Sequence, residues 1–288
     1  MTLSYAIVTP ARDEADNLRR LADCVRSQTR LPTVWVVVDS GSRDDTAAVV
    51  VALAREYPWI RLGRTPGVRR AAPGAPVVRA FHSGVSELDP LPDVIVKLDA
   101  DVSLDHDFFE RLLAEFALDP QLGIAGGGCL ELVDGEWRQT RVTGDHVRGA
   151  CRAYRRACFE AVLPLVESMG WDGVDELQAR ARGWTTRIVP NLDFRHHRRV
   201  GERDGAWHRR WRAQGAGAYA MGYRPLYLLL RTLHRARQNP AAVAMIGGYI
   251  AAAMRHAPRM EDAEARALLR NEQRLRNLPA RARELLGR

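Results

Sequence analysis

The sequence contains a single lysine, few cysteines and no long apolar segment, and these shortages exclude several classes of protein. Its four cysteines show no paired spacing, so neither a disulfide framework nor a cysteine-based metal site is indicated. The uncharged run Ala241–Met254 has fourteen residues, fewer than the ~20 that a helix needs to span a bilayer. No basic and apolar leader precedes the first strand-like segment. We therefore expect a reduced, cytoplasmic compartment.

Charges of both signs are present but unevenly distributed along the 288 residues. Residues 1–200 hold 26 basic and 28 acidic residues, whereas residues 201–288 hold 17 and 7. Nearly all basic residues are arginine, which we attribute to codon bias and to no particular function. The composition is that of a globular protein with room for a large core and an appendage. The change in charge predicts two units, residues 1–200 and a basic, amphipathic helical extension over residues 201–288.

The first third of the chain alternates between strand and helix patterns. Apolar runs at Ser4–Thr9 and Thr33–Val38 have the length of buried strands, and helical periodicity follows them at Ala15–Ser27 and Asp44–Glu56. This alternation predicts βαβ units and a parallel sheet, which is an α/β fold. The Gly-, Pro- and Arg-rich stretch Arg61–Pro76 is predicted to be a loop.

Two carboxylates, Asp99 and Asp101, directly follow the buried-strand pattern Asp93–Leu98. Ligands of open α/β sheets bind at the carboxyl ends of strands. Carboxylate oxygens suit Mg²⁺ or Mn²⁺, which in turn hold substrate phosphates. The alternative is that the two residues only cap the next helix.

Four blocks in order resemble the family 2 glycosyltransferases with the GT-A fold. The blocks are Val8–Glu14, Val38–Thr46, Lys97–Asp101 and Trp171–Glu176, and the match covers roughly residues 1–200. The resemblance implies a Rossmann-like, mostly parallel central sheet flanked by helices, with an α-helical C-terminal extension. It also implies an inverting, metal-dependent glycosyltransferase that moves a sugar from a UDP-, GDP- or dTDP-linked donor. The acceptor would be a hydroxyl of a glycan or lipid-linked molecule in cell-surface polysaccharide synthesis.

The same resemblance assigns the donor-binding residues. In the family, the first two strand-end loops contact the nucleoside, which here places Pro10, Arg12, Glu14 and Asp39 in that role. Asp99 would face the ribose or the waters of the metal.

The metal, Mn²⁺ or Mg²⁺, would be bound by Asp101, which would neutralise the leaving diphosphate. Several GT-A enzymes have a histidine as a further ligand, and alignment favours His196 over His197 for that position. A histidine pair among arginines is also compatible with a solvated surface.

Inverting transfer requires a carboxylate that removes the proton of the acceptor hydroxyl. Spacing from Trp171 favours Asp175 as this base, with Glu176 as the alternative, because Val174 replaces the first acid of the family motif. Asp172 is expected to be a support or an acceptor contact.

Four residues are candidates for contacts with acceptor or phosphate: Trp171, Asp172, Arg155 and Arg79. An indole is equally often part of the core, and Arg155 with Arg156 fits an ordinary basic helix face. The loop Arg64–Arg79, with Arg69 and Arg70, is a second candidate as a clamp on the diphosphate.

The extension combines its positive charge with five aromatics, and we expect it to bind an anionic membrane surface at the inner face of the cytoplasmic membrane. These aromatics are Trp207, Trp211, Tyr219, Tyr223 and Tyr227. The alternative is packing on the catalytic domain or dimerisation.

One other activity and two binding functions compete with glycosyl transfer. A nucleotidyltransferase would have a glycine-rich, lysine-containing loop where this chain has Pro10–Glu14. Val174 also allows a catalytically degenerate nucleotide-sugar-binding protein. Nucleic-acid binding through the extension is disfavoured, because the acidic strand-end loops would repel phosphates.

Overall fold

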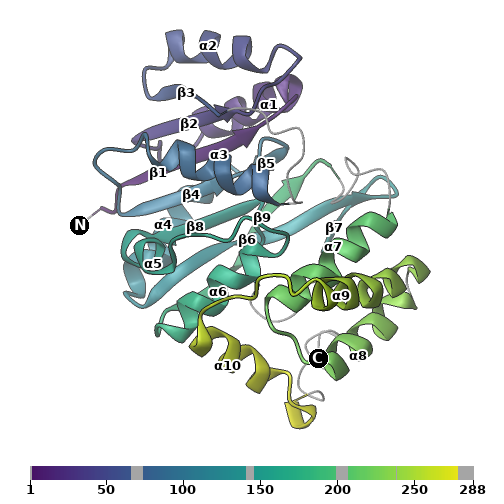
Figure 1. The fold of residues 1–288 in the computed structure, drawn as a ribbon. Coiled ribbons are helices and arrows are strands. Elements are labelled where there is room, and N and C mark those ends of the chain that lie inside the picture. Colours follow the sequence, from purple (N-terminus) through teal and green to yellow (C-terminus); the bar gives the residue numbers. More distant parts are fainter. Residues whose placement is uncertain (1, 66–73, 141–145, 199–206, 238, 278–288) are drawn as a thin grey trace.

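The computed structural model describes residues 2–65, 74–140, 146–198, 207–237 and 239–277. Within them, one nine-stranded sheet is covered by helices on both faces, and a group of further helices lies to one side (Figure 1). The strands are β1 (Tyr5–Ala11), β2 (Val34–Asp39), β3 (Ile60–Arg64), β4 (Val94–Leu98), β5 (Val102–Leu104), β6 (Leu122–Val133), β7 (Glu136–Gln139), β8 (Cys151–Arg155) and β9 (Thr185–His196). The helices that pack against the sheet are α1 (Ala15–Arg26), α2 (Thr46–Glu56), α3 (Ala75–Val85), α4 (Phe108–Leu118), α5 (Arg156–Val162) and α6 (Trp171–Ala181).

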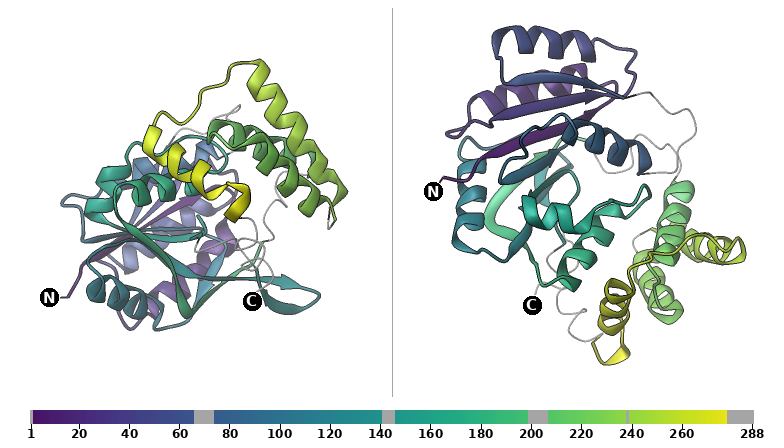
Figure 2. Two further views of the ribbon diagram at one scale, coloured as in Figure 1. Left: turned by 90° about the horizontal axis from the view of Figure 1, so that it is seen from below. Right: turned by 60° about the vertical axis from the view of Figure 1, so that its left-hand side comes forward.

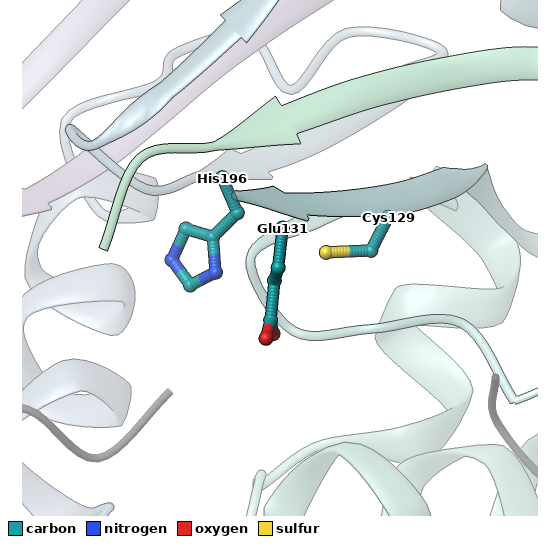
Figure 3. A group of neighbouring side chains, drawn as sticks. All are labelled: Cys129, Glu131 and His196. Carbon is teal, nitrogen blue, oxygen red and sulfur yellow. The ribbon is translucent and has the colours of Figure 1, made fainter. Parts of the chain in front are cut away.

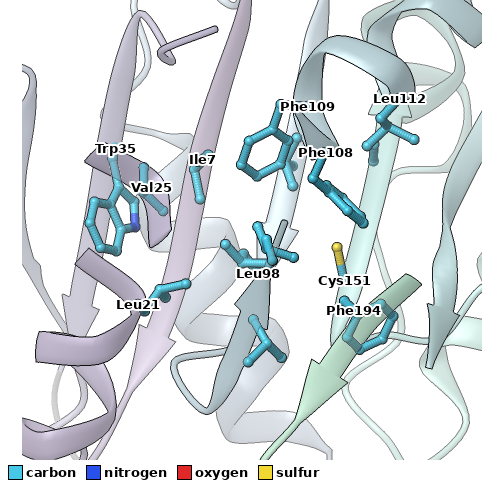
Figure 4. Close-up of a cluster of buried hydrophobic side chains, with 14 of the residues drawn as sticks. Ile7, Leu21, Val25, Trp35, Leu98, Phe108, Phe109, Leu112, Cys151 and Phe194 are labelled. Atoms are coloured by element: carbon cyan, nitrogen blue, oxygen red, sulfur yellow. The ribbon is translucent and has the colours of Figure 1, made fainter. Parts of the chain in front are cut away.

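The sheet has the order β3-β2-β1-β4-β8-β6-β9-β5, with β7 paired to β6. Its first four strands are parallel, as the βαβ pattern predicts. Their apolar runs are buried on both faces: side chains of α1, α2 and α4 join the core cluster on one face, and those of α3, α5 and α6 join the cluster on the other. Figure 4 shows the first of these clusters, in which Leu21, Val25 and Trp35 pack beside Ile7.

The second half of the sheet differs from the expected mostly parallel arrangement. β8 is antiparallel to both β4 and β6, and β5 is antiparallel to β9. β6 and β9 are parallel. The reason is connectivity: no helix of the described residues lies between β7 and β8, and a parallel neighbour would require a crossover connection. The sheet is therefore mixed, while the α/β class is as predicted.

Val133–Glu136 forms a hairpin turn between β6 and β7, with Asp134 at φ 54° and Gly135 at φ 83°, the left-handed conformations that such a turn requires. The predicted loop Arg61–Pro76 is partly wrong, because β3 runs to Arg64 and pairs with β2. Its middle, residues 66–73, lies outside the described residues.

The extension is helical, as expected. Its elements are α7 (Trp207–Ala220), α8 (Pro225–Ala236), the 3₁₀ turn η2 (Pro240–Val243), α9 (Ala244–Met254), α10 (Ala263–Glu272) and the 3₁₀ turn η3 (Leu275–Asn277). α7 and α9 cross at two glycines: a Cβ on Gly215 would lie 1.9 Å from the Met245 carbonyl oxygen, and one on Gly248 would lie 2.0 Å from that of Arg212. Only glycine permits this close approach.

The extension is attached to the rest of the chain through α10. Leu269 of α10 and Met260 form a small core with Val174 and Leu177 of α6. Both views in Figure 2 show the extension beside α6 on one side of the molecule. No helix in the described part of the chain is both long and apolar enough to cross a bilayer.

Candidate functional site

The candidate site lies at the carboxyl end of β4, where Asp99 follows the strand. The amide of Asp99 donates to the Ala150 carbonyl at 2.8 Å, which fixes the turn against the segment before β8. Lys97 is buried, and its ammonium binds the Asp99 carboxylate and the Gly149 carbonyl. Burial raises the pKa of Asp99, although the positive charge of Lys97 acts to lower it. A lysine at the strand end thus joins the Asp99 turn to the loop before β8.

Asp101 and His196 meet at this edge because β5 pairs with β9, in a register that places Val102 opposite His196. The Nε2 atom of His196 lies 3.3 Å from the Asp101 carboxylate, and one ligand atom from each of Asp99, Asp101 and His196 lies within 4.8 Å of the others. Burial acts to raise the pKa of Asp101, but the hydrogen bond and charge of His196, followed by the charge of Arg198, lower it.

These three side chains fit a divalent cation. The Nδ1 atom of His196 is buried without a hydrogen-bond partner among the described residues, which is costly unless something else binds the ring. The carboxylates of Asp99 and Asp101 supply hard oxygen ligands and His196 a nitrogen, the donor set that Mn²⁺ accepts. Here His196 contacts Asp101, whereas His197 binds Ser103 at 2.8 Å and packs on Trp137. The structure thus places His196 beside Asp101, and the role of His196 as a metal ligand stays a prediction.

A second group shares the same histidine. Cys129 and Glu131 lie two residues apart on β6, and Glu131 pairs with His196 of β9 across the sheet. In Figure 3 the Glu131 carboxylate and the Cys129 sulfur lie on one side of the imidazole, with all three ligand atoms within 4.8 Å. Nothing in the sequence reasoning singled out Cys129 or Glu131, because their proximity depends on the parallel β6–β9 register.

Arg198 connects the donor loops to this edge, and sequence reasoning missed it. Its guanidinium forms two 2.9 Å hydrogen bonds to the Glu14 carboxylate and lies 3.4 Å from Asp101. Such a bidentate pair fixes both partners. The Glu14 carboxylate is therefore paired with Arg198, whereas the sequence predicted that it contacts the nucleoside. The only sequence signal for Arg198 was its place two residues after His196.

The remaining nucleoside candidates lie at the ends of the first two strands. Pro10 lies near the end of β1, Arg12 is exposed, and Asp13 just after it has φ 55°. Asp39 ends β2, and its carboxylate accepts from the amide and hydroxyl of Ser42 at 3.0 and 2.5 Å. Because β1 and β2 are parallel neighbours, the two loops open on one edge of the sheet.

Asp175, the predicted base, is enclosed. It is 1% exposed, and its two oxygens accept from the Tyr154 hydroxyl at 2.5 Å and the Arg152 guanidinium at 3.1 Å. Burial raises the pKa of Asp175 to about 7. The positive charge of Arg152 acts to lower this pKa, and the negative charge of Glu176 acts to raise it. That pKa would suit a base, but a base must reach the hydroxyl that it deprotonates. This geometry contradicts the assignment of Asp175 as the base.

Glu176, the alternative base, is also occupied. Its carboxylate accepts from Arg152 and the Val147 amide, both at 2.7 Å, and from His146 at 2.9 Å. The imidazole of His146 also lies 3.6 Å from Asp172. Burial acts to lower the pKa of His146, but the two carboxylates raise it to about 10, so the ring is a cation at neutral pH. Glu176 is therefore a structural ion-pair partner in this geometry.

Asp172 is the acidic residue of α6 that faces the site. Its side chain is 27% exposed, and one oxygen accepts from the Gly149 amide at 3.2 Å. Gly149 is the residue whose carbonyl binds Lys97, so a continuous set of contacts joins Asp172 to Asp99. Burial acts to raise the pKa of Asp172, but the hydrogen bond and charge of His146, followed by the charge of Arg152, hold it below its usual range. Asp172 is thus an ionised carboxylate within reach of a bound molecule.

Two predicted acceptor or phosphate contacts are corrected. Trp171 is only 7% exposed, and Lys97 and Arg152 lie 5.7 Å from its ring centroid, so its face is covered by cations of the core. The Arg155 guanidinium donates to three main-chain carbonyls, those of Phe116, Asp119 and Leu122. Arg155 pairs with Val94 at the start of β4, the end of that strand away from Asp99. Arg155 and Arg156 also do not share a helix, because α5 begins only at Arg156.

The arginine clamp is only partly described. Arg79 lies on α3 and forms a 2.6 Å ion pair with Glu167, both side chains being partly exposed. Arg69 and Arg70 lie outside the described residues. The clamp therefore stays a prediction.

Known structures share this fold at low sequence identity. A mannosyltransferase from Pyrobaculum calidifontis, in complex with GDP-Man and Mn²⁺, aligns with a TM-score of 0.57 at 15% identity over 99% of this chain and 85% of its own. GalNAc-T7 with UDP, GalNAc and Mn²⁺ has a TM-score of 0.56 at 15% identity, over 69% of this chain and 44% of its own. TarS of S. aureus with UDP-GlcNAc has a TM-score of 0.56 at 13% identity, over 74% of this chain and 65% of its own.

Sequence comparison matches part of the chain to one family. No curated protein sequence matches the chain significantly. Residues 6–143, just under half of the 288 residues, match the model of glycosyl transferase family 2 and include nearly all of β1 to β7 with the Asp99–Asp101 turn. This segment is therefore that of a family 2 glycosyltransferase, and the chain has the fold of the GT-A glycosyltransferases.

Proposed function

We propose that the protein is an inverting, metal-dependent glycosyltransferase that uses a nucleotide-sugar donor. The observation that carries the proposal is the continuous set of contacts from Asp101 and His196, through Asp99 and Lys97, to the open carboxylate of Asp172. A cation-binding group and a base thus lie on one edge of the sheet. The mannosyltransferase and GalNAc-T7 structures, which contain Mn²⁺ with nucleotide ligands, support the choice of metal and donor class.

Asp101, His196 and Asp99 would hold the cation, Mn²⁺ or Mg²⁺. When bound, the cation neutralises charge on the departing diphosphate. Arg198 keeps Asp101 in place through its contacts with Glu14 and Asp101. The loops after β1 and β2, with Pro10, Arg12 and Asp39, would receive the nucleoside.

The base in this proposal is Asp172. Inversion requires a carboxylate that accepts the hydroxyl proton while the acceptor oxygen attacks the anomeric carbon from the face opposite the diphosphate. Asp172 lies in the first turn of α6 and is part-exposed, while Asp175 lies one turn further into the helix and is enclosed. The buried ion pairs of Arg152 with Asp175 and Glu176 join α6 to β8, the strand that follows the Gly149 loop. They therefore fix the position of α6 relative to that loop. His146, as a cation beside Asp172, keeps this carboxylate ionised.

The acceptor is proposed to be a hydroxyl of a glycan or lipid-linked molecule, in cell-surface polysaccharide synthesis. The location that fits is the cytoplasm, with a peripheral position at the inner face of the cytoplasmic membrane. The support is the charge of the extension, 17 basic against 7 acidic residues, which favours an anionic surface.

A donor screen tests the proposal directly. The full chain is mixed with UDP-, GDP-, dTDP- and CMP-sugars, each with and without Mn²⁺, and its thermal unfolding is followed. One donor class should stabilise the protein in the presence of Mn²⁺ and much less in its absence. Transfer from that donor should give a product of inverted anomeric configuration by NMR. Stabilisation without any transfer would instead indicate a degenerate nucleotide-sugar-binding protein, and a retained configuration would rule out the inverting mechanism.

A further inference from the structure

Three side chains of different chemistry meet where β6 pairs with β9. Cys129 and Glu131 lie two residues apart on β6, so both project from the same face of the sheet, and Glu131 is paired with His196 of β9. One ligand atom from each of the three lies within 4.8 Å of the others. Ligand atoms around a zinc ion are roughly 3.5 Å apart, so small side-chain rotations would bring all three to one cation.

The two ring nitrogens of His196 face different neighbours. Nε2 lies 3.3 Å from the Asp101 carboxylate, whereas Nδ1 has no hydrogen-bond partner among the described residues. Figure 3 shows the ring nitrogen next to the carbon that bears the side-chain bond, which is Nδ1, turned toward Glu131. His196 is only 7% exposed, and a buried nitrogen without a partner is costly. Nδ1 is therefore available to a ligand on the side of Cys129 and Glu131.

The contact with Asp101 prepares Nδ1 for a metal. A metal-binding histidine usually donates its other ring N–H to a carboxylate, which fixes the orientation of the ring and raises the basicity of the binding nitrogen. Here the N–H of Nε2 faces Asp101. A cation that binds Nδ1 displaces the proton of that nitrogen to solvent and leaves the contact with Asp101 in place. The pair thus matches the carboxylate–histidine–metal arrangement of zinc sites.

The donor set favours zinc over manganese. A thiolate, an imidazole nitrogen and a carboxylate oxygen are the usual ligands of Zn²⁺, whereas Mn²⁺ prefers oxygen. Cys129 is 3% exposed and the Glu131 side chain 16%, so the cation would enter past Glu131. The interaction that it must displace there is the 3.4 Å contact between the Arg148 guanidinium and Glu131, which is long for an ion pair.

We propose that Cys129, Glu131 and Nδ1 of His196 bind Zn²⁺, and that this Zn²⁺ and the proposed donor cation exclude one another. A neutral imidazole has a single lone pair for a metal. With a cation on Nδ1 the proton stays on Nε2, which then cannot bind a second cation beside Asp99 and Asp101. Zn²⁺ is therefore an antagonist of Mn²⁺, and the coupling is reciprocal. The antagonism rests on the proposed function, whereas the zinc site does not.

Metal titration of the full chain tests the zinc site without any sugar donor. Co²⁺ is the probe, because its bond to a thiolate gives an intense charge-transfer absorption in the near ultraviolet. Co²⁺ should produce this absorption in the wild-type chain, and Zn²⁺ should abolish it. Cys129→Ser should lose the absorption and weaken Zn²⁺ binding at least roughly tenfold, while Glu131→Gln should keep the absorption and weaken Zn²⁺ binding roughly tenfold.

Matched controls change the same residue types elsewhere. Cys24→Ser on α1 and Glu136→Gln on β7 should leave the cobalt absorption and the Zn²⁺ affinity unchanged. Thermal unfolding of each variant shows that it is folded. No thiolate absorption in the wild-type chain, or an absorption that survives Cys129→Ser, would overturn the zinc site. Equal Zn²⁺ affinities of the wild-type chain and Cys129→Ser would do the same.

The antagonism is measured at the same absorption, which reports only the cation bound to sulfur. Saturating Mn²⁺ should weaken Co²⁺ binding about tenfold in the wild-type chain, a usual size for coupling between two sites. Asp99→Asn, which removes a ligand of the donor cation alone, should abolish this effect. Co²⁺ binding that is unchanged by bound Mn²⁺, or weakened equally in Asp99→Asn, would overturn the exclusion at His196. Failure of Mn²⁺ to bind at all, with the cobalt absorption intact, would contradict the proposed function and leave the zinc site supported.

Discussion

The Tyr154 hydroxyl donates a 2.5 Å hydrogen bond to the Asp175 carboxylate, and both side chains are buried. The pair connects β8 to α6, so it contributes to holding the helix that carries Asp172. Tyr154→Phe should lower the free energy of unfolding by about 1–3 kcal/mol, because it removes one of the two partners of a buried carboxylate. Urea unfolding of the metal-free protein measures this. A loss below ~0.5 kcal/mol would mean that Arg152 alone satisfies Asp175.

Asparagine substitutions of Asp172 and Asp175 should have opposite signatures. Asp172→Asn should reduce kcat roughly 10²–10⁴-fold, the usual contribution of a general base, with little change in donor affinity or thermal stability. Asp175→Asn should reduce stability, because Arg152 loses a charged partner, while the enzyme that remains folded keeps most of its kcat. Single-turnover rates at a temperature well below unfolding separate the two effects. Full activity of Asp172→Asn with loss in Asp175→Asn would return the base to Asp175.

The contrast between these residues shows where sequence reasoning stops. The acidic block Trp171–Glu176 was predicted to hold the base, and its helix does form. Spacing along the chain does not tell which turn of the helix is covered by β8, and that cover, from Arg152 and Tyr154, decides which acid can reach a substrate. Trp171 fails as an acceptor platform for the same reason.

The candidate cation site of Asp99, Asp101 and His196 was more predictable because its residues lie at the ends of strands. An apolar run followed by Asp99 and Asp101 identifies a strand edge without knowledge of its neighbours, and the family resemblance supplied His196. Arg198, Cys129 and Glu131 depend on the registers of β9 against β5 and β6, which a single sequence does not contain. The mixed second half of the sheet was missed for a related reason, since β8 contains Arg152 and Arg155 among its five residues and lacks the apolar pattern of a buried strand.

Metal binding should depend on the oxygen ligands and much less on the neighbouring thiol. Asp101→Asn should weaken Mn²⁺ binding at least tenfold and reduce donor binding with it, because Mn²⁺ prefers carboxylate oxygen. Cys129→Ser should change Mn²⁺ affinity less than threefold, although the sulfur lies near His196. Calorimetric titration of each variant with Mn²⁺, alone and with the nucleotide diphosphate, measures this. Equal losses in both variants would indicate that the cation is bound on the Cys129 side of the imidazole.

The stability of the metal-free protein should fall at alkaline pH. The pKa of His146 is raised to about 10 by Glu176 and Asp172, against the effect of burial, and that of His196 is raised to about 10 by Asp101, also against burial. An unfolded histidine has a pKa near 6.5, so the folded state binds more protons between these values. The stabilisation from both ion pairs is complete below about pH 6.5 and is lost as pH rises toward 10.

Urea unfolding at pH 6.5, 8 and 10 should show this decline, and His146→Gln should make it shallower by removing one of the two titrating pairs. His106→Gln, at an exposed position before α4, serves as the matched control and should keep the wild-type slope. A wild-type free energy of unfolding that is constant from pH 6.5 to 10 would contradict the two ion pairs. An unchanged slope in His146→Gln would contradict the pairing of His146 with Glu176 and Asp172, and with it the reason for the ionised state of the proposed base.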